Sequence, residues 1–373
     1  MSSIVYVDDK ADDWLASLPE NVRQTFRDFD PKEEAKAAFE AASASDLWVF
    51  DFFYSDDRTQ QIALDEDNGL SLFQKWRRLK LEERPPAALV SSDLESAVGS
   101  DISPGRGHIL AQRASVEWVG EKSQATAEFL VGLADASNAI QKSIMAITST
   151  DRAGDRPLNE EICLRLLNAP KESPWRTSAE RQLDRARPPL LSSVSEPQAK
   201  ARLLLAWLLH NVLPYPSFLI SAQHAAARLG LKTESFALLS QAEANDLGRM
   251  LQAARYEGPL AASSPDKWWR AGIDDIVWGF SQGKVDYIEG LSAAAGAVPI
   301  NMLDIEDPVV VSNPDLVETD EIASAKDCVR AQDEHFPPDV PPAWVKLADV
   351  RDHADLAEKV VFEDRELLNV HSQ

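Results

Sequence analysis

The chain has 373 residues, of which 44% are hydrophobic and 27% are charged. This length suggests about two or three domains, and the hydrophobic content is sufficient for each to bury a core. The net charge is −23, with −11 over residues 1–150 and −12 over residues 301–373. Because acidic surfaces repel phosphate backbones and anionic lipid headgroups, the composition argues against nonspecific binding to nucleic acid or membranes.

Three features bear on the cellular compartment. The N-terminal sequence MSSIVYVDDK lacks the basic region and the long apolar run of a signal peptide. No apolar run approaches the roughly 18 residues that a membrane-spanning helix needs. Two cysteines, Cys163 and Cys328, make neither a disulfide framework nor a thiolate metal site. We therefore expect a cytoplasmic protein with no membrane partner.

Short apolar strands alternate with helical segments over the first 150 residues. The expected strands are residues 4–7, 22–29, 47–50, 87–90 and 116–119. The expected helices are residues 12–18, 31–42, 69–79 and 123–145. Five strands joined by helices predict an α/β domain over residues 1–150, with a parallel sheet that is covered on both faces.

Helical periodicity replaces this alternation from residue 155 onward. The expected helices are residues 160–167, 198–212, 216–229, 235–254 and 268–280. We therefore predict a mainly α-helical domain over residues 151–300. Residues 301–373 are acidic and proline-rich, with one candidate strand at 307–311. We expect them to form an irregular region that packs on the helical domain or extends it.

Polar side chains follow four strands of the predicted sheet. In chain order they are Asp8, Asp9, Asp51, Ser91 and Lys122. The carboxyl ends of parallel strands meet at one edge of a sheet, so these side chains should converge there. Three carboxylates at one place repel one another unless a hard cation joins them, and Mg²⁺ prefers oxygen ligands. The sequence therefore predicts a magnesium site.

Five short motifs carry a family resemblance: IVYVDD, DLWVFD, NGL, LVSSD and WVGEK. Together they resemble the response-regulator receiver domain of two-component signalling over about residues 2–145. The resemblance implies a flavodoxin-like, doubly wound, five-stranded parallel sheet. It also implies that Asp8, Asp9, Asp51 and the backbone carbonyl of Phe53 bind Mg²⁺.

The resemblance further implies the chemistry of a phosphorelay. Asp51 would accept a phosphoryl group from a histidine kinase or a small phosphodonor. Ser91 would hydrogen-bond the phosphoryl group and Lys122 would pair with it. Trp118 stands near the position of the family's aromatic switch residue. Beyond its own phosphorylation and dephosphorylation, we expect no enzyme activity.

The chain departs from the family pattern in three places. An acidic insertion of about ten residues lies within residues 54–67, and a second insertion, DISPGRG, lies at residues 101–107. Ser123 follows Lys122, where the family has proline. These differences alter the predicted output face but leave every reactive group in place.

The leading hypothesis is a signalling protein in which phosphorylation of Asp51 switches the binding of the helical domain to an unidentified protein partner. Receiver-like domains joined to unfamiliar helical regions also occur in bacterial stress and phage-defence systems. One alternative is a pseudo-receiver that serves as a scaffold or decoy without phosphorylation. Another is a DNA-binding response regulator that uses residues 216–240, although the acidic charge argues against a nucleic-acid partner. A phosphatase of similar topology ranks last, because Phe53 replaces the second aspartate that it needs.

Overall fold

The computed structural model describes residues 2–31, 34–53, 68–79, 84–98, 102–150, 159–282 and 286–370. The chain forms two compact units. The N-terminal unit comprises Met1–Leu166, Pro188–His210 and Gly258–Ser264. The C-terminal unit comprises Leu167–Arg187, Asn211–Glu257 and Pro265–Gln373. The domain boundaries at residues 150 and 300 remain predictions. No described helix is long and apolar enough to cross a membrane.

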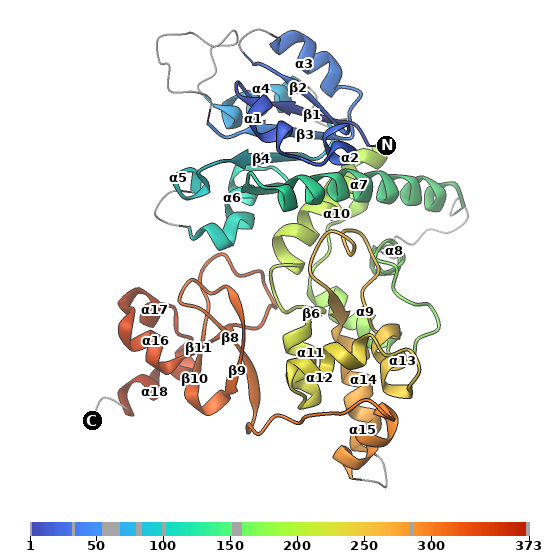
Figure 1. Cartoon of the computed structure of the whole chain (residues 1–373), viewed down its shortest axis with the longest axis vertical. Coiled ribbons are helices and arrows are strands. Elements are labelled where there is room, and N and C mark those ends of the chain that lie inside the picture. The colour runs from blue at the N-terminus through green and yellow to red at the C-terminus, as the bar shows by residue number, and fades with distance from the viewer. Residues whose placement is uncertain are drawn as a thin grey trace. The chain divides into compact units, whose positions relative to one another are not determined.

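The N-terminal unit contains the predicted five-stranded parallel sheet (Figure 1). Its strands are β1 (Ile4–Val7), β2 (Phe26–Phe29), β3 (Leu47–Asp51), β4 (Ala87–Ser91) and β5 (Trp118–Glu121). They lie in the order β2-β1-β3-β4-β5, and every neighbouring pair is parallel. This order is compatible with a flavodoxin-like fold, so the predicted α/β class is confirmed.

The three central strands explain why this sheet is buried on both faces. β1, β3 and β4 read IVYV, LWVFD and AALVS, and every residue in them is buried. Continuous apolar runs of this kind are typical of parallel strands covered by helices on both sides. On one face, Trp48 and Phe50 pack edge-on against Trp76, with ring centroids 5.6 Å and 5.2 Å apart.

Helices connect and cover these strands. They are α1 (Ala11–Ala16), α2 (Glu20–Arg23), α3 (Ala35–Ala42), α4 (Gly69–Leu79), α5 (Leu94–Val98), α6 (Gly107–Ala114), α7 (Gln124–Thr150), α8 (Asn159–Leu166) and α10 (Pro197–Trp207), the last followed by a π-helix (Leu208–Val212). Residues 22–25 differ from expectation, because Pro19 starts the short helix α2 and leaves only Phe26–Phe29 for the edge strand. Helix α3 begins at Ala35 rather than at Pro31. Part of the predicted insertion at 101–107 forms a 3₁₀ turn that leads into α6, a helix that the periodicity did not indicate.

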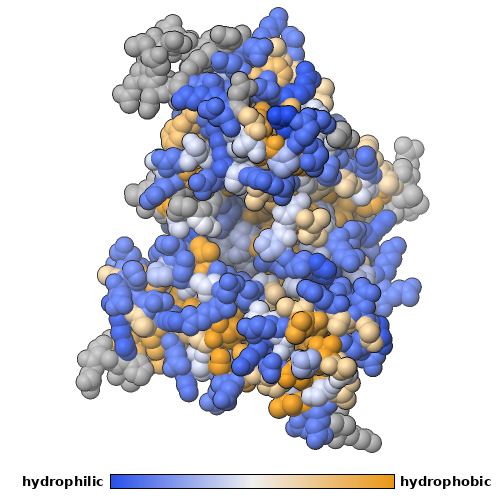
Figure 2. Space-filling view, in the orientation of Figure 1, coloured by the Kyte–Doolittle hydropathy of each residue, from blue (hydrophilic) through white to orange (hydrophobic). Residues whose placement is uncertain are grey.

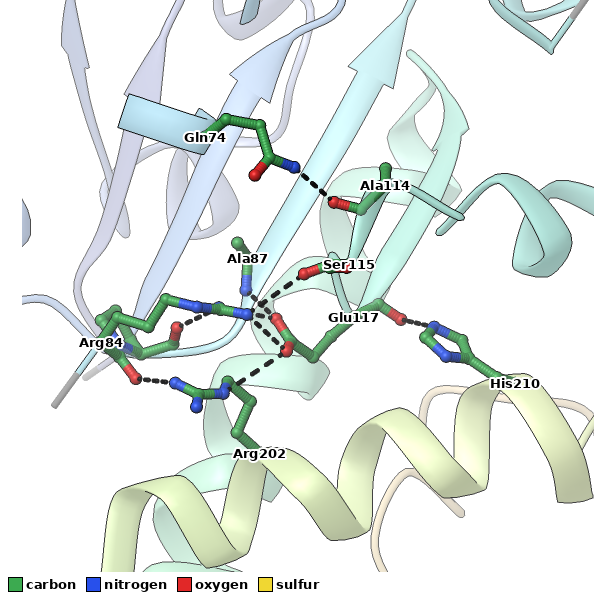
Figure 3. A network of polar contacts seen from close by, with 9 residues as sticks. Gln74, Arg84, Ala87, Ala114, Ser115, Glu117, Arg202 and His210 are labelled. Carbon is green, nitrogen blue, oxygen red and sulfur yellow. Dashed lines mark hydrogen bonds and ion pairs between the residues drawn. The ribbon is translucent and has the colours of Figure 1, made fainter. Parts of the chain in front are cut away.

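A buried ionic network fastens α10 to the start of β5 (Figure 3). The Glu117 carboxylate accepts two hydrogen bonds of 3.0 Å from the Arg84 guanidinium group and one of 2.5 Å from Ala87 N–H. From α10, Arg202 Nε lies 3.7 Å from Glu117 Oε1, and Arg202 also donates to the Arg84 carbonyl at 3.2 Å. His210 Nε2 lies 3.1 Å from the Glu117 carbonyl oxygen. The network makes α10 part of the N-terminal unit.

The C-terminal unit begins with a helical core. Its helices are α9 (Arg176–Arg185), α11 (Ala222–Leu229), α12 (Thr233–Ser240), α13 (Asp246–Ala253), α14 (Arg270–Ser281) and α15 (Tyr287–Ala295). A two-stranded antiparallel sheet, β6 (Leu219–Ser221) and β7 (Lys267–Trp269), interrupts two of the expected helical segments. Hydrophobic residues gather on the visible surface in the region of α12 and α14 (Figure 2), and Leu238 and Trp278 are among the exposed large side chains.

Residues 308–346 form a four-stranded sheet. Its strands are β8 (Pro308–Ser312), β9 (Glu318–Ser324), β10 (Cys328–Ala331) and β11 (Ala343–Lys346), in the order β10-β11-β8-β9. Three short helices follow: α16 (Leu347–Asp352), α17 (Ala354–Lys359) and α18 (Arg365–Val370). The strand expected near residues 307–311 is present as β8, whereas the sequence did not indicate the other three. These strands are short, and β9, which reads ETDEIAS, is mostly polar with a single buried residue, so their pattern lacks a clear apolar run.

Candidate functional site

The carboxyl edge of the parallel sheet carries a cluster of three aspartates. The chain leaves β1 towards β2 on one side, and β3 lies on the other side, which makes the β1–β3 boundary a topological switch point. The β1–β3 register pairs Val7 with Phe50, so Asp8 and Asp51 are carried to the same edge. One oxygen from each of Asp8, Asp9 and Asp51 lies within 4.8 Å of the other two. The convergence predicted from the strand ends is therefore present.

Asp8 is held as a fixed acceptor in this cluster. It is buried, and its Oδ1 accepts a 2.8 Å hydrogen bond from Lys10 N–H. Its Oδ2 accepts from the Tyr6 hydroxyl group and from Lys122 Nζ at 2.8 Å. Tyr6 and Asp8 are two residues apart, and alternate residues of an extended segment point to the same side. Both carboxylate oxygens are thus occupied by donors, which hold the side chain in one orientation.

Asp51 has a strongly perturbed acidity. Its side chain is only 8% exposed, and Lys122 Nζ lies 3.0 Å from Oδ1. Burial, and then the negative charge of Asp8, raise the pKa of Asp51 to about 7, while Lys122 opposes both effects. Desolvation and a like charge both penalise the ionised carboxylate. Asp51 therefore changes protonation state near neutral pH, as reactive groups in functional sites often do.

The donor set fits a small hard cation. It consists of carboxylate oxygens, two of the three aspartates are buried, and their ligand atoms are close enough to share one ion. Mg²⁺ is held in proteins by a few carboxylates together with water and phosphate oxygens. Lys122 now offsets part of the repulsion between Asp8 and Asp51, and a divalent cation would offset more. The acidic cluster can therefore hold a metal ion; that the ion is Mg²⁺ remains a prediction.

Ser91 and Phe53 lie beside the cluster. The Ser91 hydroxyl donates to the carbonyl of Asp93 at 3.0 Å and accepts from Asp93 N–H at 3.1 Å. The Ser91 carbonyl accepts from Lys122 N–H at 2.8 Å, so the two residues are joined through the backbone. Phe53 lies two residues beyond Asp51, at an isolated bridge to Asn68. Phosphoryl binding by Ser91 and metal binding by the Phe53 carbonyl remain predictions.

Gly69 is a positioning residue that the analysis of reactive side chains did not assign. It begins α4 directly against β3, and a Cβ atom at this position would lie 1.9 Å from the Asp51 carbonyl oxygen. Only glycine allows this close approach without moving the Asp51 backbone. The NGL motif includes this glycine, but the motif alone does not show that glycine is required there because of the contact with Asp51.

The structure describes some of the other features that the sequence led us to expect, but not all of them. Trp118 is half-buried on β5, and its ring lies 5.0 Å from that of Phe129 on α7. The insertion at 54–67 lies outside the described residues. Residues 216–240, the candidate DNA-binding segment, contain α11 and α12 joined at Gly230, which has a φ of 69°. The exposed positions of α12 include Glu234 and Leu238, neither of which donates a hydrogen bond to bases.

Comparisons add no relative to this description: no protein-family model matches the chain, and a search of curated proteins finds no match. The fold and the acidic cluster therefore define the N-terminal unit by themselves. It is a flavodoxin-like α/β unit with three aspartates at the carboxyl edge of its sheet. Such an arrangement is compatible with a receiver-like domain.

Proposed function

We propose that this protein is a signalling protein whose N-terminal unit is a phosphorylatable receiver. Asp51 is the acceptor, and Asp8, Asp9 and Asp51 hold Mg²⁺, with the Phe53 carbonyl as a further ligand. The observation that carries the proposal is the convergence of Asp51 with two other aspartates and Lys122 at the switch point of the sheet.

The chemistry assigned to the chain is transfer of one phosphoryl group. An ionised Asp51 oxygen forms a bond to phosphorus while the P–N bond of a phosphohistidine, or the P–O bond of an acyl phosphate, breaks. Lys122, already 3.0 Å from Asp51, pairs with the charge on the transferred group. A metal ion held by Asp8, Asp9 and Asp51 would supply further charge neutralisation. Because Asp51 must be ionised to react, its raised pKa without a metal opposes the reaction, and a bound cation would favour the ionised form.

The proposed switch depends on two side chains whose contacts phosphorylation would change, the hydroxyl group of Ser91 and the ammonium group of Lys122. Ser91 exchanges its bonds to Asp93 for one to the phosphoryl group, and Lys122 shifts from Asp8 towards the same group. Both residues adjoin β5, whose other end is fixed to α10 through Glu117. Along the chain, α10 leads into the C-terminal unit, which is the proposed binding region for a protein partner.

Intact-mass spectrometry of the full chain with acetyl phosphate and Mg²⁺ tests this proposal. Wild type should gain one phosphoryl group, which Asp51→Asn should fail to gain. Asp13→Asn is the matched control, because Asp13 is an exposed aspartate of α1, and it should be labelled as the wild type is. Equal labelling of Asp51→Asn would overturn the assignment. A wild-type chain that stays unlabelled would favour the scaffold alternative, in which partner binding does not depend on Asp51.

A further inference from the structure

The C-terminal unit contains a cavity that the receiver chemistry does not use. Its volume is about 260 Å³, and its walls come from α11, the first residue of α14, the strands β8, β9 and β11, and the segments between them. A second cavity of about 110 Å³ shares Arg270 and Pro341 with the first. Taken together, the two cavities reach the lower end of the size range of ordinary small-molecule sites, roughly 300–1,000 Å³.

Part of the lining of the larger cavity is aromatic and apolar. Tyr215, Phe336 and Trp344 line it, together with Ile220 and several prolines. The rings of Tyr215 and Phe336 lie 5.0 Å apart and are tilted by 60°. Aromatic rings and prolines provide rigid contact surface for a planar or apolar body.

The lining of the two cavities also carries more guanidinium groups than carboxylates. Arg228 and Arg270 line the larger cavity, and Arg185 and Arg270 line the smaller one. Asp274 pairs with Arg228 at 2.6 Å and lies 3.7 Å from Arg270 Nε, which is too far for a hydrogen bond. Burial, and then the positive charge of Arg228, lower the pKa of Arg270. Asp274 therefore leaves part of this positive charge unbalanced, although the chain as a whole carries −23.

The acidic side chains of the two walls are already engaged. Glu318 accepts a hydrogen bond from Ser221 and lies 3.4 Å from His224 Nε2. Asp339 lies 3.3 Å from Arg187 Nε. A ligand can therefore pair with the arginines without displacing either carboxylate.

The smaller cavity also has unused hydrogen-bonding capacity. Gln182 Oε1, Ser217 Oγ and Arg270 Nε are buried without a hydrogen-bond partner among the described residues, and all three residues line this cavity. Buried polar atoms are costly when they stay unpaired, so the structure gains stability if a small shift of this wall lets a polar ligand group reach them.

We propose that the C-terminal unit binds a small organic anion, with its aromatic or apolar body against Tyr215, Phe336 and Trp344 and its acidic group at Arg270, where the two cavities adjoin. A carboxylate, sulfonate or phosphate group matches the planar fork of a guanidinium group. This binding site is independent of the phosphorylation of Asp51.

Fluorescence titration of the full chain with two related probes tests the proposal. The probes are 8-anilinonaphthalene-1-sulfonate and N-phenyl-1-naphthylamine, which share an aromatic body but differ in the sulfonate. We expect one sulfonate probe per chain, bound about tenfold more tightly than the neutral probe. Arg270→Gln should remove the preference for the sulfonate probe, and Arg270→Lys should restore part of it. Trp344→Ala should weaken the binding of both probes. Arg249→Gln, a change at an exposed arginine of α13, should leave the affinity for both probes unchanged.

The outcomes separate the specific site from general apolar binding. Equal affinity for the two probes, or a preference for the sulfonate that survives Arg270→Gln, would overturn the proposal. Thermal unfolding checks that each variant is folded. If Arg270→Gln fails that check, Arg228→Gln replaces it, because the Arg228 side chain is 37% exposed and its loss leaves no deep cavity.

Discussion

Lys122 Nζ lies 3.0 Å from Asp51 Oδ1, and it also contacts Asp8 Oδ2 at 2.8 Å. One partly buried ammonium group therefore joins two carboxylates at the ends of different strands. The bridge offsets part of the repulsion that raises the pKa of Asp51. It also connects the end of β5 to the ends of β1 and β3, so any change of charge at Asp51 acts on three strands at once.

Replacing Lys122 should destabilise the N-terminal unit. Lys122→Met leaves Asp8 and Asp51 buried without their shared cation, and we expect a loss of about 3 kcal/mol in the free energy of unfolding at pH 8. Urea unfolding measures this loss. Lys36→Met is the control, because the Lys36 side chain is 92% exposed and its ion pair at 4.0 Å should contribute less than about 0.5 kcal/mol. Equal small losses in both variants would contradict the bridging role.

The raised pKa of Asp51 predicts that ionisation of this residue lowers the stability of the fold as pH rises. An aspartate with a pKa near 3.8 when unfolded and about 7 when folded stabilises the fold below pH 3.8, and this contribution is lost as pH rises through 7. Asp51→Asn, which stays neutral, should therefore exceed the wild type in stability at pH 8 by on the order of 2–4 kcal/mol without divalent cations. At pH 5 the gain should be smaller. Unfolding free energies of both proteins at the two pH values, in EDTA, check the sign; a gain independent of pH would refute it.

The close contact at Gly69 predicts that adding a single methyl group there, as in Gly69→Ala, disturbs the position of Asp51. Gly69→Ala must displace the Asp51 carbonyl or the start of α4, which we expect to cost about 1–3 kcal/mol and to slow labelling of Asp51 by acetyl phosphate. Gly279→Ala in α14 is the matched control, since a Cβ atom there meets nothing within 4 Å. The control should be stabilised by about 0.5–1 kcal/mol. Normal labelling of Gly69→Ala would show that the site tolerates the displacement.

The network around Glu117 predicts a further loss of stability. Glu117→Ala leaves the guanidinium groups of Arg84 and Arg202 without their shared carboxylate, and removal of one partner from a buried ion pair costs about 3–5 kcal/mol. Glu121→Ala, at the exposed end of β5, should cost less than about 0.5 kcal/mol. Limited proteolysis should also cut the chain near α10 faster in Glu117→Ala only. A protected α10 in that variant would show that other contacts hold the helix.

The sequence predicted most of the sheet and the core of the site because both follow from local patterns. Each central strand is a short apolar run that ends in a polar residue, as at Asp8 and Asp51. Once the strands are parallel, their ends must share an edge, so the meeting of the aspartates with Lys122 needs no further information.

The remaining features depend on contacts between distant residues. The bond between Arg202 and the Arg84 carbonyl spans 118 positions, and no periodicity links the two residues. Gly69 is required because of where α4 meets Asp51, which only the packed structure reveals. The strands of the C-terminal sheet are four to seven residues long, and an acidic edge such as β9 has the composition of a loop. Tyr6 could have been assigned, since it precedes Asp8 by the two-residue period of a strand.

Thermal unfolding with Mg²⁺ and beryllium fluoride, which mimics a phosphoryl group on aspartate, tests the central claim most directly. Wild type with both ligands should unfold about 5 °C or more above wild type with Mg²⁺ alone, because ligands that bind only the folded state stabilise it. Asp51→Asn should show no such increment. An absent increment in the wild type, or an equal one in Asp51→Asn, would contradict a phosphoacceptor at Asp51.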